Sequence, residues 1–92
     1  MSINEQDLTE LYKVITSLNS VEECKTFFAD LCTYKEVEQM AQRISAAKLI
    51  LNGATYEEVI NKTEISSATL SRVSKAVKYG NGYKSVLTKN EK

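Results

Sequence analysis

Apolar residues recur along the chain at the three- and four-residue spacing of an α-helix, and no segment alternates as a β-strand does. The first stripe predicts a helix over roughly residues 5–18, and its members are Leu8, Leu11, Tyr12, Ile15 and Leu18. The second predicts a helix that opens at residue 20, with a buried face of Val21, Cys24, Phe27, Phe28, Leu31 and Cys32. The third and longest helix is expected to end at Asn52-Gly53, and its stripe is Val37, Met40, Ala41, Ile44, Ala47 and Leu51.

Polar residues mark where these helices begin. Three pairs have the spacing of a capping box, in which each side chain binds the backbone N–H of the other residue: Ser20 with Glu23, Thr33 with Glu36, and Thr55 with Glu58. Thr55 is expected to open a short fourth helix, whose inward residues are Val59 and Ile60. A fifth helix is expected to start at Ser66 or Ser67 and to run to about Tyr79.

The chain changes character after the fifth helix. Gly80-Asn81-Gly82 is expected to break the helix. Residues 83–87 are expected to add a short closing turn, and residues 88–92 to fray. The chain has no proline and only three glycines, which argues against an all-β sandwich. With 92 residues there is room for one domain, so the sequence predicts a single all-α domain over residues 1–92.

Composition narrows the class of function. No apolar run approaches the roughly 20 residues of a membrane span and no signal peptide opens the chain, so we expect a cytoplasmic protein without a membrane partner. The chain has no histidine, which excludes Ser-His-Asp and Cys-His pairs and zinc sites that need imidazole. A glycine-rich phosphate loop is also missing, so we expect neither an enzyme nor a metal site. Cys24 and Cys32 lie about 12 Å apart on one helix, too far for a disulfide.

Charge is divided between the two halves of the chain. Residues 1–41 hold three lysines and eight acidic residues, whereas residues 42–92 hold nine basic and four acidic residues. Between Ile65 and Asn90 there are five basic residues and no acid. This asymmetry fits either a surface that faces nucleic acid or a solvated helix face.

The segment from residue 55 to 79 has the pattern of a helix-turn-helix. Ile65 is placed to plug the turn, while Leu70 and Val73 seat the second helix on the first. Small residues at the start of the second helix suit base edges in a major groove, and we expect Ser67, Ala68 and Ser71 to contact them, with Thr69 either contributing or facing the body. Arg72, Lys75 and Lys78 are candidates for phosphate contacts. Glu64 stands where such turns commonly hold a left-handed glycine, at a cost of about 1 kcal/mol.

Three stretches carry a resemblance to a known family: YKEVEQMAQRISAAKLILNGATYEEV, SSATLSRVSK and YGNGYKSVL. Over about residues 31–87 the chain resembles the Trp repressor superfamily, and more closely its YerC/YecD branch. The resemblance implies an intertwined all-helical homodimer that acts as a transcriptional regulator, with two helix-turn-helix heads about 34 Å apart on double-stranded DNA.

The resemblance also implies an effector pocket. In the Trp repressor two arginines sandwich the indole ring of the corepressor, and Arg43 and Arg72 match them, while Thr33 and Thr69 match two threonines of that pocket. Val73 replaces a glycine of the family pattern and Ala76 replaces a serine, which argues against L-tryptophan itself as the effector. Alternatively, Arg72 contacts phosphate and Arg43 pairs with helix acids. No other cofactor is expected.

A second function class fits the same segments. The helix-turn-helix heads of the dimer could dock an acidic partner protein, and the zero net charge and acidic first half are compatible with this. Salt dependence separates the two classes, because release of counterions from DNA gives a steep dependence of affinity on salt.

Overall fold

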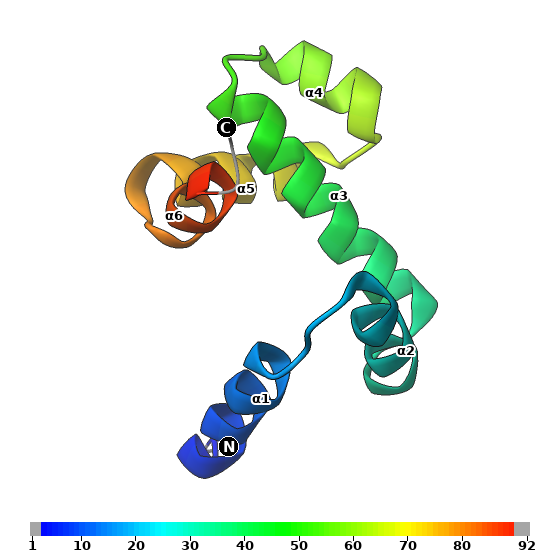
Figure 1. Cartoon of the computed structure of the whole chain (residues 1–92). Helices are drawn as coiled ribbons and strands as arrows, with labels where there is room; N and C mark the ends of the chain where they lie inside the picture. Colours follow the sequence, from blue (N-terminus) through cyan, green and yellow to red (C-terminus); the bar gives the residue numbers. More distant parts are fainter. Residues whose placement is uncertain (1–2, 90–92) are drawn as a thin grey trace. The chain divides into compact units, whose positions relative to one another are not determined.

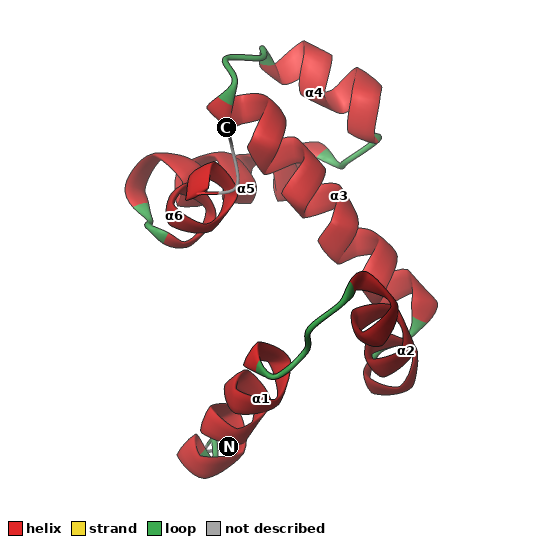
Figure 2. Ribbon diagram, viewed as in Figure 1, coloured by secondary structure: helices red, strands yellow, loops and turns green. Residues whose placement is uncertain are grey.

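The computed structural model describes residues 3–89, which form six α-helices and no strand (Figures 1 and 2). The helices are α1 (Glu5–Thr16), α2 (Val21–Leu31), α3 (Tyr34–Leu51), α4 (Tyr56–Thr63), α5 (Ser67–Tyr79) and α6 (Gly82–Lys89). The all-α prediction is therefore confirmed. Within residues 3–89 we find no helix with the length and apolarity needed to cross a bilayer.

The helix starts follow the capping residues of the sequence. The Thr55 backbone N–H donates to Glu58 Oε1 at 2.8 Å, and the Glu58 N–H donates to Thr55 Oγ1 at 3.2 Å, which completes the predicted box at α4. At α2 the Glu23 N–H donates to Ser20 Oγ, but the Glu23 carboxylate accepts from the N–H of Asn19 rather than of Ser20. A further cap lies at Asn4, whose side chain accepts from two N–H groups of α1.

The chain divides after Tyr34 into two compact units. The first unit holds α1 and α2, in which no residue is buried. The predicted buried face of α2 is only partly covered within this chain. Val21 is 77% exposed and Leu31 is 48% exposed, whereas the other members are half-buried: Cys24, Phe27, Phe28 and Cys32. The rings of Phe27 and Phe28 do contact each other, with centroids 5.9 Å apart. Cys24 and Cys32 are both free, as their spacing predicts.

The second unit has a small apolar core at the meeting point of α3, α4 and α5. In Figure 1, α4, α5 and α6 gather around the C-terminal half of α3. The core side chains are Ala46, Ala47, Val59, Ile65, Leu70, Val73 and Val77. Ile65, Leu70 and Val73 hold the predicted positions, but Ile60 is 38% exposed because it is rotated away from Val59 on the eight-residue α4. The single domain expected over residues 1–92 stays a prediction.

The structure of the C-terminal segment differs from the prediction. Residues 82–89 form a regular helix, α6, where only a short turn was expected, and Thr88 and Lys89 belong to it instead of fraying. The Thr88 hydroxyl donates to the Lys84 carbonyl at 2.5 Å, and Tyr83 and Leu87 pack against the core. Tertiary packing thus supports a helix that local signals did not indicate. Residues 90–92 of the predicted frayed end lie outside the described residues.

Candidate nucleic-acid interface

Helices α4 and α5 form the predicted helix-turn-helix, and a left-handed residue makes the turn between them. Glu64 has φ 59° and ψ 21°, and its N–H donates to the Ile60 carbonyl at 3.0 Å. This is the position where the sequence predicted a strained non-glycine residue. Ser66 then caps α5, because its hydroxyl accepts from the Thr69 N–H at 3.2 Å. The turn therefore ends one helix and starts the next within three residues.

The two helices are also joined by side chains. The Tyr56 hydroxyl, at the first residue of α4, donates to Ser74 Oγ in α5 at 2.5 Å. Ser74 is 2% exposed, and it is the one polar side chain classed as buried between residues 3 and 89. Because a hydrogen bond needs a set distance and direction, this contact constrains how α4 lies on α5. The sequence did not indicate it, since Tyr56 and Ser74 are 18 residues apart.

The exposed face of α5 carries most of the predicted DNA contacts. Leu70, Val73, Ser74 and Val77 are buried on one side of the helix. Six predicted residues are exposed: Ser67, Ala68, Ser71, Arg72, Lys75 and Lys78. Thr69 differs, because it is half-buried and its hydroxyl accepts a hydrogen bond from Ser66 Oγ at 3.0 Å. Two orientations were left open for Thr69, and this geometry fits the one in which its side chain faces the rest of the second unit and not the solvent.

Two acidic residues of this unit lie on α4 and not on α5. Glu57 and Glu58 are in the first turn of α4, where they complement the positive end of the helix dipole. The pKa of the Glu58 carboxyl is lowered, first by the hydrogen bond from the Thr55 backbone N–H and then by the one from the Thr55 hydroxyl. From Ile65 to Lys89 the chain has basic residues and no acid. The exposed surface of α5 is therefore positively charged.

Three of the four predicted effector residues line one small pocket. Its volume is about 180 Å³, and it is lined by Arg43, Thr69, Arg72, Val73, Ala76 and Tyr83. The fourth, Thr33, lies in the first unit, directly before α3. Tyr83 was missed because it belongs to α6, which the sequence did not predict as a helix. Arg43 and Thr69 also line an adjoining polar pocket of about 200 Å³ with Gln39, Gln42, Ile65 and Ser66.

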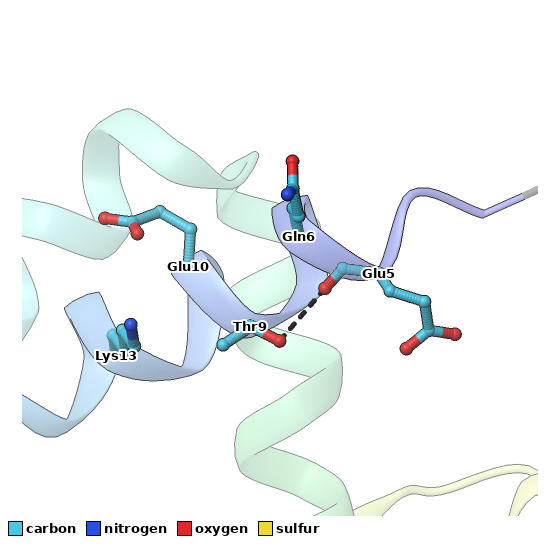
Figure 3. Close-up of a pocket in the computed structure, with 5 residues that line it drawn as sticks. All are labelled: Glu5, Gln6, Thr9, Glu10 and Lys13. Carbon is cyan, nitrogen blue, oxygen red and sulfur yellow. Dashed lines mark hydrogen bonds between the residues drawn. The ribbon is translucent and has the colours of Figure 1, made fainter.

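Two further hollows differ in chemistry. An apolar one of about 490 Å³ is lined by Ile44, Ala76, Gly80, Gly82, Tyr83, Val86 and Leu87. Another, of about 460 Å³, follows α1 and is lined by Glu5, Gln6, Thr9, Glu10 and Lys13, all of them exposed (Figure 3). Figure 3 shows the ends of Glu5, Gln6 and Glu10 pointing in different directions, and Thr9 bonds the Glu5 carbonyl of its own helix. The α1 surface therefore does not converge on a ligand.

Comparison with known proteins places this fold in a family. The sequence profile of the family described as Trp repressor protein matches residues 6–91. The chain belongs to the Trp repressor family. It is 42% identical over 76 residues to the uncharacterized protein YerC of Bacillus subtilis (strain 168), which covers 83% of this chain and 73% of YerC. The resemblance predicted from the sequence is therefore confirmed.

Solved structures agree with this assignment. A crystal structure of a candidate Trp repressor from Staphylococcus aureus matches with a TM-score of 0.89 and 37% identity, over 94% of this chain and 87% of that one. The crystal structure of a TrpR-like protein from Eubacterium eligens ATCC 27750 matches with a TM-score of 0.88 and 36% identity, over 94% and 90% of the two chains. The Trp repressor-like fold is thus shown, and this is a family of regulators rather than of enzymes.

Proposed function

We propose that this protein is a sequence-specific DNA-binding regulator of transcription that acts as a helix-turn-helix homodimer. The observation that carries the proposal is the exposed face of α5, which begins with small side chains, continues with basic ones and includes no acid. Ser67, Ala68 and Ser71 would meet base edges, where small polar and methyl groups can approach closely. Arg72, Lys75 and Lys78 would contact phosphates on either side.

The assignment of Thr69 changes within this proposal. Its hydroxyl already accepts a hydrogen bond from Ser66, and it lines the same two pockets as Arg43. We therefore place Thr69 with the pocket and not with the base contacts. A Thr69→Val variant, which keeps the shape but loses the hydroxyl, should leave the preferred DNA sequence unchanged, whereas Ser71→Val should alter it.

A homodimer is part of the proposal because the first unit lacks a core of its own. Helices α1 and α2 have 12 and 11 residues and contain no buried residue. Isolated helices shorter than about 12–15 residues are marginal in water, so their apolar faces need a surface to cover them. Two copies related by a two-fold axis would present two α5 helices to half-sites about 34 Å apart.

Selection from a random duplex library tests the function directly. We expect purified protein to enrich a two-fold related site, with a half-site spacing of about one helical turn of DNA. A Lys75→Ala, Lys78→Ala double variant should bind every duplex more weakly, and the slope of log affinity against log salt should fall by about 2. Lys13→Ala, Lys25→Ala removes the same charge from α1 and α2 and serves as the matched control. If the protein bound no duplex from the library, the proposal would be refuted.

We also propose that the pocket between Arg43 and Arg72 can take a small-molecule effector, and that Thr69 is a further residue in contact with it. Thr33 belongs to the first unit and stays a prediction as an effector residue. The volume of about 180 Å³ lies below the roughly 300–1,000 Å³ of usual small-molecule sites. Val73 and Tyr83 occupy part of the wall, so L-tryptophan should not change DNA affinity. A gain in affinity on adding L-tryptophan would refute that exclusion.

The apolar hollow between α3, α5 and α6 favours one alternative, a module that binds another protein. Its lining is almost entirely apolar, as in the centre of many protein interfaces. An interface of that kind depends less on salt than DNA binding does. If Val86→Glu abolished the regulatory activity of the protein while the Lys75→Ala, Lys78→Ala double variant left it unchanged, the interaction module would replace the DNA-binding proposal.

A further inference from the structure

One exposed aromatic residue on α5 has no role in the interface described so far. Tyr79 is the last residue of α5 and is 84% exposed. No hydrogen bond of its hydroxyl to another residue is found in the described part of the chain, residues 3–89. A single exposed aromatic residue is common on a protein surface. Tyr79 is a candidate contact because it lies beside the basic residues of the proposed DNA-binding face.

The helical period places Tyr79 on the exposed face of α5, together with the proposed DNA contacts. Successive residues of an α-helix are rotated by about 100°, so positions separated by three, four or seven residues share a face. Arg72, Lys75 and Tyr79 stand in that relation, on the side opposite the buried residues Leu70, Val73 and Val77. Lys78 lies further toward the edge of the same face. Tyr79 therefore shares this exposed side of α5 with Arg72 and Lys75.

The chain is shaped so that Tyr79 stays uncovered. At Gly80 the backbone leaves the helix in an extended conformation, with φ −96° and ψ −177°. A Cβ atom at Gly80 would lie 2.8 Å from the Ala76 carbonyl oxygen, so the chain turns very close to the end of α5. Helix α6 then packs beside α5 through Tyr83 and Leu87, whereas Tyr79 remains on the open side.

We propose that Tyr79 is an additional DNA-binding residue, whose hydroxyl donates a hydrogen bond to a backbone phosphate beside the half-site. This rests on the proposed function. A helix rises about 1.5 Å per residue, so Tyr79 lies roughly 18 Å from Ser67 along α5. When the start of α5 meets the base edges, that distance carries its end out of the groove to the sugar-phosphate backbone. Tyrosine is among the side chains that commonly bind phosphates, and Lys75 and Lys78 hold the phosphate nearby.

Loss of a neutral hydrogen-bond donor and loss of a basic residue affect the salt dependence of DNA binding differently. Neutralisation of a phosphate by lysine releases counterions, so Lys75→Ala should lower affinity and also reduce the salt slope by about 1. The phenol of Tyr79 carries no charge, so its loss should lower affinity and leave the salt slope unchanged. A change in overall packing would instead appear as a lower unfolding midpoint.

The experiment compares Tyr79→Phe with wild type on a selected and a scrambled duplex over a range of salt concentrations. Hydrogen bonds to charged groups are the stronger kind, so we expect Tyr79→Phe to bind both duplexes about 10- to 100-fold more weakly, with an unchanged salt slope and unfolding midpoint. Tyr34 is also 84% exposed, so Tyr34→Phe is the matched control and should bind like wild type. Tyr79→Ala should bind no better than Tyr79→Phe.

The outcomes separate this inference from the function on which it rests. If wild type binds DNA and Tyr79→Phe binds equally well, the phosphate contact is overturned and the DNA-binding proposal stands. The same holds if Tyr79→Ala weakens binding while Tyr79→Phe does not, because the hydroxyl then makes no contact. If wild type binds neither duplex, both proposals are overturned.

Discussion

The hydrogen bond from Tyr56 to Ser74 allows a quantitative test of what holds α4 against α5. Its two partners differ in exposure, because Tyr56 is 50% exposed whereas Ser74 is 2% exposed. If the tyrosine hydroxyl is removed, Ser74 Oγ stays buried without its donor and water cannot replace it. If the serine hydroxyl is removed, the Tyr56 hydroxyl can still bind water. The two substitutions should therefore have unequal costs.

The size of the difference follows from the cost of an unpaired buried group. Tyr56→Phe should lower the free energy of unfolding by about 1–2 kcal/mol, and Ser74→Ala by at most about 1 kcal/mol. In a domain of this size about 1 kcal/mol shifts the midpoint by roughly 4–8 °C, so Tyr56→Phe should be clearly measurable. Once Ser74 is alanine, Tyr56→Phe should have little further effect, which corresponds to a coupling energy of about 1–2 kcal/mol.

Thermal and urea unfolding of wild type, both single variants and the double variant complete the cycle. All four proteins should be measured at one concentration, because association of folded copies would raise the apparent stability. Tyr12 is also exposed and lies in the first unit, so Tyr12→Phe is a control for loss of a tyrosine hydroxyl elsewhere. Additive costs, or a larger cost for Ser74→Ala than for Tyr56→Phe, would refute the reasoning.

Three further predictions concern the backbone and the capping box of the second unit. Glu64→Gly should raise the free energy of unfolding by about 1 kcal/mol, because φ 59° suits glycine; an unchanged urea midpoint would contradict this. Gly80→Ala should lower it by about 1–3 kcal/mol through the contact with the Ala76 carbonyl, whereas Gly82→Ala, with no atom within 4 Å, should have a much smaller effect. The pKa of Glu58 is lowered on folding, so its carboxylate stabilises the fold above the unfolded pKa and this contribution is lost as pH falls through the folded pKa. The stability difference between wild type and Glu58→Gln should therefore shrink in acid, and a difference that is constant with pH would contradict the assignment.

Local signals predicted most of the helices because their boundaries depend on nearby residues. The capping box of Thr55 and Glu58 involves two side chains three positions apart, and it forms as predicted. The left-handed conformation of Glu64 could likewise be read from its place between two capped helices. Helix α6 could not, because its start at Gly82 follows two poor helix formers and its support comes from packing of Tyr83 and Leu87 on distant residues.

The residues of the candidate site were likewise only partly predictable from the sequence. Exposure of Arg72 and Lys75 follows from the helical period once the buried side of α5 is known. The same period extended by one turn reaches Tyr79, so that residue was within reach of sequence reasoning. The bond between Tyr56 and Ser74 was not, because it depends on the angle between two helices. A helical period gives the direction of each side chain but carries no information about a neighbouring element.

The first unit illustrates that distinction most clearly. The stripes of α1 and α2 predicted two apolar faces, and these faces exist, yet they contain no buried residue. An amphipathic helix of 11 or 12 residues gains most of its stability from packing of its apolar face, so α1 and α2 require a covering surface to persist in water. In the proposed homodimer, a second copy of the chain would supply such a surface without any further protein. Dimer formation and helix formation in this unit would then be one equilibrium, and dilution should reduce the helical content of residues 5–31 before that of the second unit.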